Sequence, residues 1–112
     1  DNKLSLEEDM ENKAVKRVNV VEATSLLNTD AVTIVDIRDR QSFEVDHMQN
    51  AHHVTGNNAK DFIDKTDKDQ PLLVYCYHGN SSQVAAEYFS ENGFNKVYTL
   101  DGGFDIWRTK NS

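Results

Sequence analysis

Two short apolar runs, each followed by a segment with a helical pattern, constrain the fold of this chain most strongly. Residues 31–37 (AVTIVDI) and 72–76 (LLVYC) are almost continuously apolar and rich in β-formers, as strands covered on both faces are. Segments of both kinds alternate along the chain. Strands are expected at 17–20, 31–37, 51–54, 72–76 and 96–100. Helices are expected at 21–27, 58–66 and 104–107 and from Ser81 to an end at Asn92-Gly93, and a charged loop with a short helix is expected to begin at 38–44. The alternation predicts a three-layer α/β/α fold around a mainly parallel sheet of five strands.

The length and charge of the chain limit the number of domains and the classes of partner that it can have. At 112 residues it is long enough for one domain and too short for two. Residues 1–16 are polar and charged with scattered apolar side chains, so we expect a polar leader there and a single domain over residues 17–112. No apolar run approaches the ~18 residues of a membrane span, and no signal-peptide pattern is visible. The net charge of -7 argues against nucleic acid and anionic membranes as partners.

Cys76 is the only cysteine, and it lies at the end of the expected strand 72–76, where the chain turns into a helix. Parallel sheets bind ligands at the carboxyl ends of their strands. A thiol at that place faces the free N–H groups and the positive dipole end of the helix, which stabilise a thiolate and hold an anion. A single cysteine forms no disulfide within the chain and fits a reducing compartment, so we expect a cytoplasmic protein.

The residues after Cys76 distinguish a reactive cysteine from a small buried core residue, which is the common alternative. They are mostly small and polar and carry no formal charge, as a loop that binds anions through its backbone amides requires. Gly79 permits the positive φ that lets successive amides converge, and the serines that follow are expected to cap the helix. We therefore assign Cys76 as the catalytic nucleophile. The substrate-binding residues are expected to be Tyr77, His78, Gly79, Asn80, Ser81 and Ser82.

Asp36 and Arg38 lie at the end of the neighbouring expected strand, 31–37. They either border the pocket behind the residues that touch the substrate or form a structural ion pair.

Three histidines, His47, His52 and His53, are candidates for a metal site. Their spacing with one distant cysteine matches no standard zinc pattern, so we expect neither a metal nor another cofactor.

Three segments together resemble a known family. Residues 35–39 (VDIRD) resemble its first signature, which continues through Ser42-Phe43-Glu44 with His47 and Ala51. Residues 76–82 (CYHGNSS) resemble its active-site loop, and 100–104 (LDGGF) with Trp107 its closing pattern. Over about residues 17–110 the chain thus resembles the rhodanese family, most closely its single-domain bacterial thiosulfate sulfurtransferases. Where that family usually has Gly-His-Ile-Pro-Gly-Ala, this chain has DHMQNA at 46–51, in a segment that is mainly structural in the family.

The resemblance implies a double displacement. The Cys76 thiolate takes the outer sulfur of a small anionic donor such as thiosulfate, releases sulfite and carries the sulfur as a persulfide. Cyanide, or a small or protein thiol, then accepts that sulfur. The loop amides would stabilise the outer persulfide sulfur, the hydroxyls of Ser81 and Ser82 would add donors, and His78 is the one basic candidate in the loop.

Two other functions stay open at this stage. A cysteine-dependent phosphatase or arsenate reductase holds its oxyanion in a Cys-x5-Arg loop, but here the sixth position after Cys76 is Ser82. A phosphate in this loop would lack its bidentate arginine partner. A carrier module, which docks a partner and passes persulfide sulfur to it, needs the same cysteine and loop as the enzyme. Steady-state turnover with a free thiol would indicate the enzyme, whereas transfer only to a specific protein would indicate the carrier.

Overall fold

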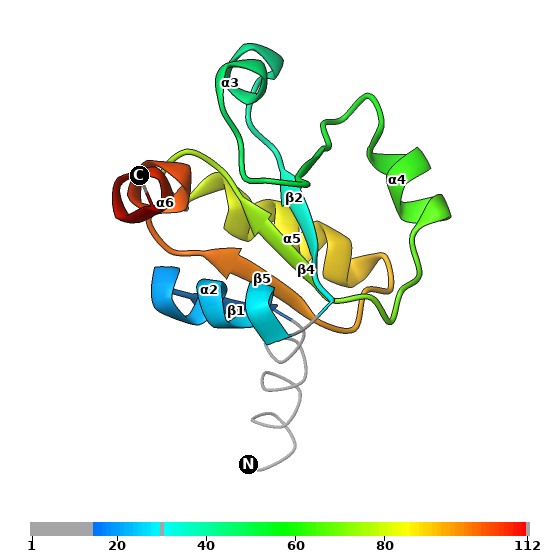
Figure 1. Cartoon of the computed structure of the whole chain (residues 1–112). Helices are drawn as coiled ribbons and strands as arrows, with labels where there is room; N and C mark the ends of the chain where they lie inside the picture. The colour runs from blue at the N-terminus through cyan, green and yellow to red at the C-terminus, as the bar shows by residue number, and fades with distance from the viewer. Residues whose placement is uncertain (1–14, 30, 112) are drawn as a thin grey trace, which may run out of the picture.

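The computed structural model describes residues 15–29 and 31–111, and its centre is one sheet of five strands in the order β1-β5-β4-β2-β3 (Figure 1). The strands are β1 (Val15–Val18), β2 (Thr33–Asp36), β3 (His52–His53), β4 (Leu72–Tyr75) and β5 (Val97–Leu100). Every pairing between these strands is parallel. The predicted parallel sheet is confirmed.

Helices cover both faces of the sheet, which confirms the predicted three layers (Figure 1). They are α2 (Val20–Thr29), α3 (Arg40–Val45), α4 (Ala59–Lys65), α5 (Ser81–Glu91) and α6 (Gly103–Asn111). One core cluster joins the sheet to α4 and α5 through Ile63 and Phe89. The other joins it to α2 and α6 through Ala23 and Phe104.

The position of β4 explains its unbroken apolar sequence. All four of its residues are buried. Leu72 and Val74 point into the cluster under α4 and α5, whereas Leu73 and Tyr75 point into the cluster under α2 and α6. A strand that is covered on both faces needs apolar residues at every position. This strand carries the chain directly to Cys76 at its carboxyl end.

The start of the domain differs from the expectation for residues 17–20. Strand β1 begins at Val15, because residues 15–18 pair in register with β5. The side chain of Asn19 accepts the Glu22 N–H at 2.8 Å and the Glu22 carboxylate accepts the Asn19 N–H at 3.0 Å, so a reciprocal cap starts α2 at Val20. Residues 1–14 lie outside the described residues, and the division into a leader and a domain stays a prediction.

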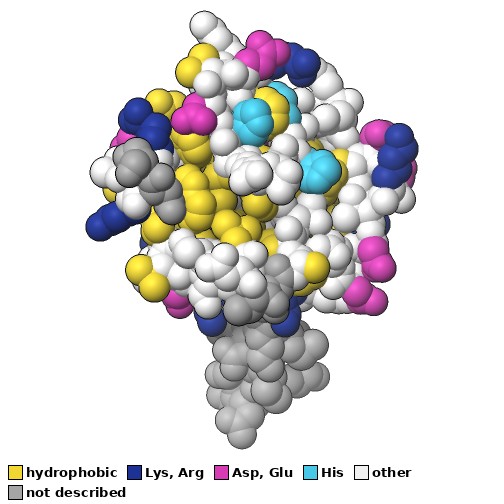
Figure 2. All heavy atoms as spheres, viewed as in Figure 1, with side chains coloured by type: hydrophobic (Ala, Val, Ile, Leu, Met, Phe, Trp, Pro, Cys, Tyr) yellow, Lys and Arg dark blue, Asp and Glu magenta, His cyan; other side chains and the backbone are white. Residues whose placement is uncertain are grey.

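A hollow of apolar side chains opens on the face that carries α2 and α6 (Figure 2). Its apolar wall comes from Leu27, Val32, Ile34, Met48 and Trp107. Its lining includes no residue of the Cys76 loop. Within the described part of the chain, no helix is long and apolar enough to cross a membrane.

Candidate active site

Cys76 lies directly after β4 and is buried at the carboxyl end of the sheet. The backbone N–H groups of Gly79 and Ser82 donate to its Sγ at 3.0 Å and 3.3 Å. Gly79 has a φ of 97°, which confirms the predicted positive φ. The sulfur therefore sits in a cradle made by the loop backbone and the first turn of α5.

The pKa of the Cys76 thiol lies below its ordinary value. Burial alone raises this pKa, but the Ser82 hydroxyl and the amides of Ser82, Gly79 and His78 outweigh burial because they stabilise the thiolate. The Ser82 hydroxyl oxygen is fully buried and has no well-aligned partner among the described residues, although it lies close enough to the sulfur to lower its pKa. Since a hydroxyl hydrogen rotates freely, Ser82 keeps a donor available for a sulfur anion.

The expected serine caps of α5 are wrong. Asn80 is the N-cap residue, and its side chain makes no capping hydrogen bond. Ser81 and Ser82 are the first two helical residues, and Ser82 uses its amide for the Cys76 sulfur. The sulfur thus takes a place that a capping side chain occupies in many helices.

The first turn of α6 holds the opposite side of the Cys76 loop. The N–H groups of Phe104 and Asp105 donate to the carbonyls of Cys76 and Tyr77 at 2.8 Å and 3.1 Å. A Cβ on Gly103 would lie 2.5 Å from both carbonyl oxygens, so only glycine permits this approach. The loop carbonyls therefore face α6 while its amides face the sulfur. Sequence reasoning placed Gly103 and Phe104 in a closing pattern but missed this contact, which explains why α6 begins at Gly103.

Asp36 and Arg38 form a buried ion pair next to the loop. Arg38 Nη2 lies 2.8 Å from Asp36 Oδ2, and Nε donates to both carboxylate oxygens at 3.1 Å. The Tyr75 hydroxyl donates to the same carboxylate at 2.5 Å. Burial raises the pKa of Tyr75, and the hydrogen bond to Asp36 raises it further, so this hydroxyl stays protonated. Sequence reasoning missed Tyr75, whose partner is 39 positions away.

The Arg38 guanidinium also lies near two aromatic rings, one on α6 and one in the Cys76 loop. Its Cζ lies 4.3 Å from the ring centroid of Phe104 and 5.8 Å from that of Tyr77. Burial by itself lowers the pKa of Arg38, but the hydrogen bonds and charge of Asp36 raise it above the ordinary value, so the guanidinium stays charged. The Asp36–Arg38 pair thus packs against Phe104, whose N–H donates to the Cys76 carbonyl.

The remaining residues expected to bind substrate form the outer rim of the loop. Tyr77, His78, Asn80 and Ser81 are exposed, in contrast to the buried Gly79 and Ser82. The rim includes no Asp, Glu, Lys or Arg side chain.

The histidines do not assemble a metal site in the described residues. The rings of His47 and His53 both stack on the Phe43 ring, with centroids 3.9 Å and 4.8 Å from that of Phe43. No group of three histidine, cysteine, aspartate or glutamate side chains converges on one point in residues 15–29 and 31–111.

Curated relatives resemble the chain over most of its length. A protein named thiosulfate sulfurtransferase GlpE from Pseudomonas aeruginosa is 52% identical over 83 residues, which cover 74% of this chain and 76% of the relative. A protein of the same name from Ectopseudomonas mendocina is 50% identical over 93 residues, which cover 83% of this chain and 84% of the relative.

Solved structures show the same fold. A rhodanese-related protein from Thermoplasma volcanium has a TM-score of 0.74 at 22% identity, covering 86% of this chain and 93% of that one. A protein of unknown function from Rhodopseudomonas palustris, described as a possible tyrosine phosphatase, has a TM-score of 0.76 at 26% identity, covering 93% and 87%. The model of the rhodanese-like domain matches residues 19–110. The chain belongs to the rhodanese-like domain family, as its three signature segments predict.

Proposed function

We propose that this chain is a thiosulfate sulfurtransferase that carries the transferred sulfur as a persulfide on Cys76. The observation that carries the proposal is the Cys76 sulfur, buried in a cradle of backbone N–H groups with a lowered pKa. The names of relatives about 50% identical to the chain support the donor.

In the first half-reaction, the Cys76 thiolate attacks the outer sulfur of thiosulfate. A new bond forms between Sγ and that sulfur, the S–S bond of thiosulfate breaks, and its electron pair leaves with sulfite. The product is a Cys76 persulfide with the negative charge on the outer sulfur. The amides of Gly79 and Ser82 and the buried Ser82 hydroxyl stabilise this charge, and the donor anion meets the uncharged rim first.

In the second half-reaction, cyanide or a thiol attacks the outer persulfide sulfur. The S–S bond breaks and its electron pair returns to Cys76 Sγ, which restores the thiolate. The sulfane sulfur passes from donor to acceptor without any external oxidant or reductant. Splitting one transfer into two displacements is the advantage of a covalent intermediate.

The phosphatase alternative lacks its main anion-binding group. A bidentate arginine gives a phosphate two parallel, charge-assisted hydrogen bonds. Ser82 stands where the Cys-x5-Arg pattern places that arginine, and one hydroxyl donor supplies neither the charge nor the fork. Phosphatase activity is therefore not expected, although one structural neighbour is described as a possible tyrosine phosphatase.

Steady-state turnover with thiosulfate and cyanide tests the proposal against the carrier alternative. We expect one sulfite and one thiocyanate for each turnover, with the parallel double-reciprocal lines of a ping-pong reaction. Transfer to a particular protein, without turnover on cyanide or any small thiol, would instead make the chain a persulfide carrier.

Replacing Ser82 with alanine removes the hydroxyl and keeps the amide. We expect the pKa of Cys76 to rise and persulfide loading at neutral pH to slow by about tenfold to a hundredfold, as loss of a hydrogen bond to a charged group costs ~1.5–3 kcal/mol. Stopped-flow loading with thiosulfate measures the change. Ser90→Ala, in the last turn of the same helix, is the matched control. Equal loading rates in both variants would show that the hydroxyl does not act on the sulfur.

The pH dependence of Cys76 reactivity follows from the direction of its pKa shift. Because the folded thiol ionises more readily, alkylation by iodoacetamide should rise with pH and reach its plateau below the range of an ordinary thiol, whose pKa is about 8.5. The same protein unfolded in denaturant supplies the reference. The shift also stabilises the fold above the unfolded pKa, and this contribution is lost as pH falls through the folded pKa. If the pH midpoint of alkylation in the folded protein were at or above that of the unfolded chain, the loop amides would not be stabilising the thiolate.

A further inference from the structure

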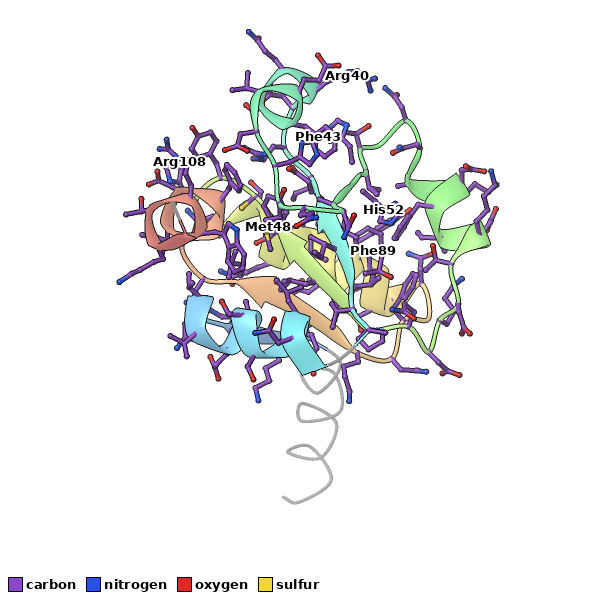
Figure 3. The ribbon with its side chains drawn as sticks, in the orientation of Figure 1. Arg40, Phe43, Met48, His52, Phe89 and Arg108 are labelled. Carbon is purple, nitrogen blue, oxygen red and sulfur yellow. The ribbon has the colours of Figure 1, made fainter. Side chains whose placement is uncertain are left out.

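A pocket of 330 Å³ lies beside the Cys76 loop, between α3 and α6. Its walls include Arg38, Asp46 after α3, Tyr77 of the loop, and Phe104 and Arg108 of α6. Figure 3 shows Arg108 at the edge of α6 that faces α3. The pocket therefore shares one wall, Tyr77, with the loop that carries the nucleophile.

Arg38 offers this pocket a fixed group with spare donors. Its side chain is 4% exposed. Nε and Nη2 are bound by the Asp36 carboxylate and the Asp46 carbonyl, the latter at 2.6 Å. In the described part of the chain its Nη1 group makes no hydrogen bond, so two of the five guanidinium N–H groups stay available. Because these contacts already fix the guanidinium, Arg38 loses little side-chain conformational entropy when it binds a carboxylate.

Charges of both signs complete the pocket. The only ion-pair partner of Arg108 among the described residues is Asp105, at 3.4 Å on the same helix, and both side chains are largely exposed. Such pairs are weak, so Arg108 is free to turn toward a ligand. The side chain of Asp46 has no partner within residues 15–29 and 31–111. The pocket thus offers the guanidinium groups of Arg38 and Arg108 to a ligand carboxylate and the carboxylate of Asp46 to a ligand ammonium group. A carboxylate and an ammonium group together are the two charged groups of an α-amino acid.

The reach to the sulfur limits what the ligand can be. Tyr77 follows Cys76 directly, and consecutive Cα atoms are about 3.8 Å apart. Tyr77 lines the pocket but Cys76 does not, so the buried sulfur lies beyond the pocket wall. A ligand held by its α-amino-acid group must therefore carry its reactive atom on an arm several bonds long.

We propose that this pocket binds the α-amino-acid group of a small thiol acceptor whose thiol stands on such an arm. The inference rests on the proposed sulfur transfer and names the acceptor class for its second half-reaction. The acceptor thiol attacks the outer sulfur of the Cys76 persulfide anion, the S–S bond breaks, and the electron pair returns to Cys76 Sγ. The acceptor leaves as its own persulfide and keeps the proton of its thiol, so no other reactant is needed.

A panel of thiols tests the headgroup and the arm separately. Glutathione has an α-amino-acid group and a long arm, cysteine has the group on a short arm, and 2-mercaptoethanol has no such group. For the unmodified chain we expect kcat/KM for glutathione to exceed that for each of the others by about tenfold, the effect of one charge-assisted hydrogen bond. Equal values for glutathione and 2-mercaptoethanol would overturn the proposal.

Variants in the pocket make the test specific to this site. Arg108→Gln and Asp46→Asn should each lower the ratio of kcat/KM for glutathione to kcat/KM for cyanide by about tenfold, since one charge-assisted contact is lost in each. Arg40→Gln is the matched control, because Arg40 lies on the side of α3 turned away from α6 (Figure 3), pairs with Glu44 at 3.1 Å and is not in the pocket wall. Its ratio should stay unchanged.

The outcomes separate the two proposals. An unchanged ratio in Arg108→Gln and Asp46→Asn, in protein that loads from thiosulfate and discharges to cyanide, would overturn the subsite alone. Failure of the unmodified chain to load would overturn the sulfur transfer and the subsite with it.

Discussion

Replacing Cys76 with serine is expected to abolish sulfur transfer. An alcohol in the same cradle is neither ionised near neutral pH nor soft enough to attack sulfur, and no other described residue holds a sulfur atom in that cradle. The steady-state rate with thiosulfate and cyanide should fall by at least about a thousandfold, because removal of a catalytic nucleophile typically costs that much or more in rate.

The fold should survive this change, because serine is close in size to cysteine and keeps the N–H contacts of the loop. Thermal unfolding followed by circular dichroism checks this in the same preparation. Retained turnover in the folded Cys76→Ser variant would remove the persulfide from the mechanism.

Replacing Gly79 with valine is expected to damage activity more than stability. Gly79 has a φ of 97°, and a Cβ there would lie 2.9 Å from the Gly102 nitrogen and 3.2 Å from the Leu100 carbonyl oxygen. The loop must move to accommodate valine, and the Gly79 amide then leaves the sulfur. We expect a loss in kcat/KM of about a hundredfold with a loss of ~1–3 kcal/mol in unfolding free energy, the cost of a strained backbone conformation.

Gly56→Val is the matched control, since a Cβ on Gly56 meets no atom within 4 Å and its φ is not positive. Enzyme kinetics and denaturant unfolding of both variants separate the two effects. A Gly79→Val protein that keeps its activity but loses stability would show that the glycine serves only the fold.

The sheet could be predicted because its central strand is covered on both faces. The unbroken apolar run of β4 is the consequence of two core clusters, and the alternation of strands with helices fixes the parallel pairing. The ends of elements depend on contacts that a local pattern does not contain. Strand β1 starts at Val15 because β5 pairs with it, and α6 starts at Gly103 because the Cys76 loop lies against it.

The nucleophile and its cradle could be predicted for a similar reason. Cys76 and the amides that surround it belong to one short segment, so the residue types in that segment are enough to indicate amides that donate to the sulfur. The roles of neighbouring side chains depend on distant partners. Asp36 meets Tyr75 only through the pairing of β2 with β4. Arg38 meets Phe104 only because α6 packs on the loop.

A persulfide on Cys76 can be detected by intact mass spectrometry of the protein before and after thiosulfate, and again after cyanide. We expect a gain of about one sulfur mass on Cys76, as for a covalent persulfide intermediate, and its removal by cyanide. An unchanged mass after thiosulfate, in folded protein whose Cys76 still reacts with iodoacetamide, would contradict the persulfide intermediate.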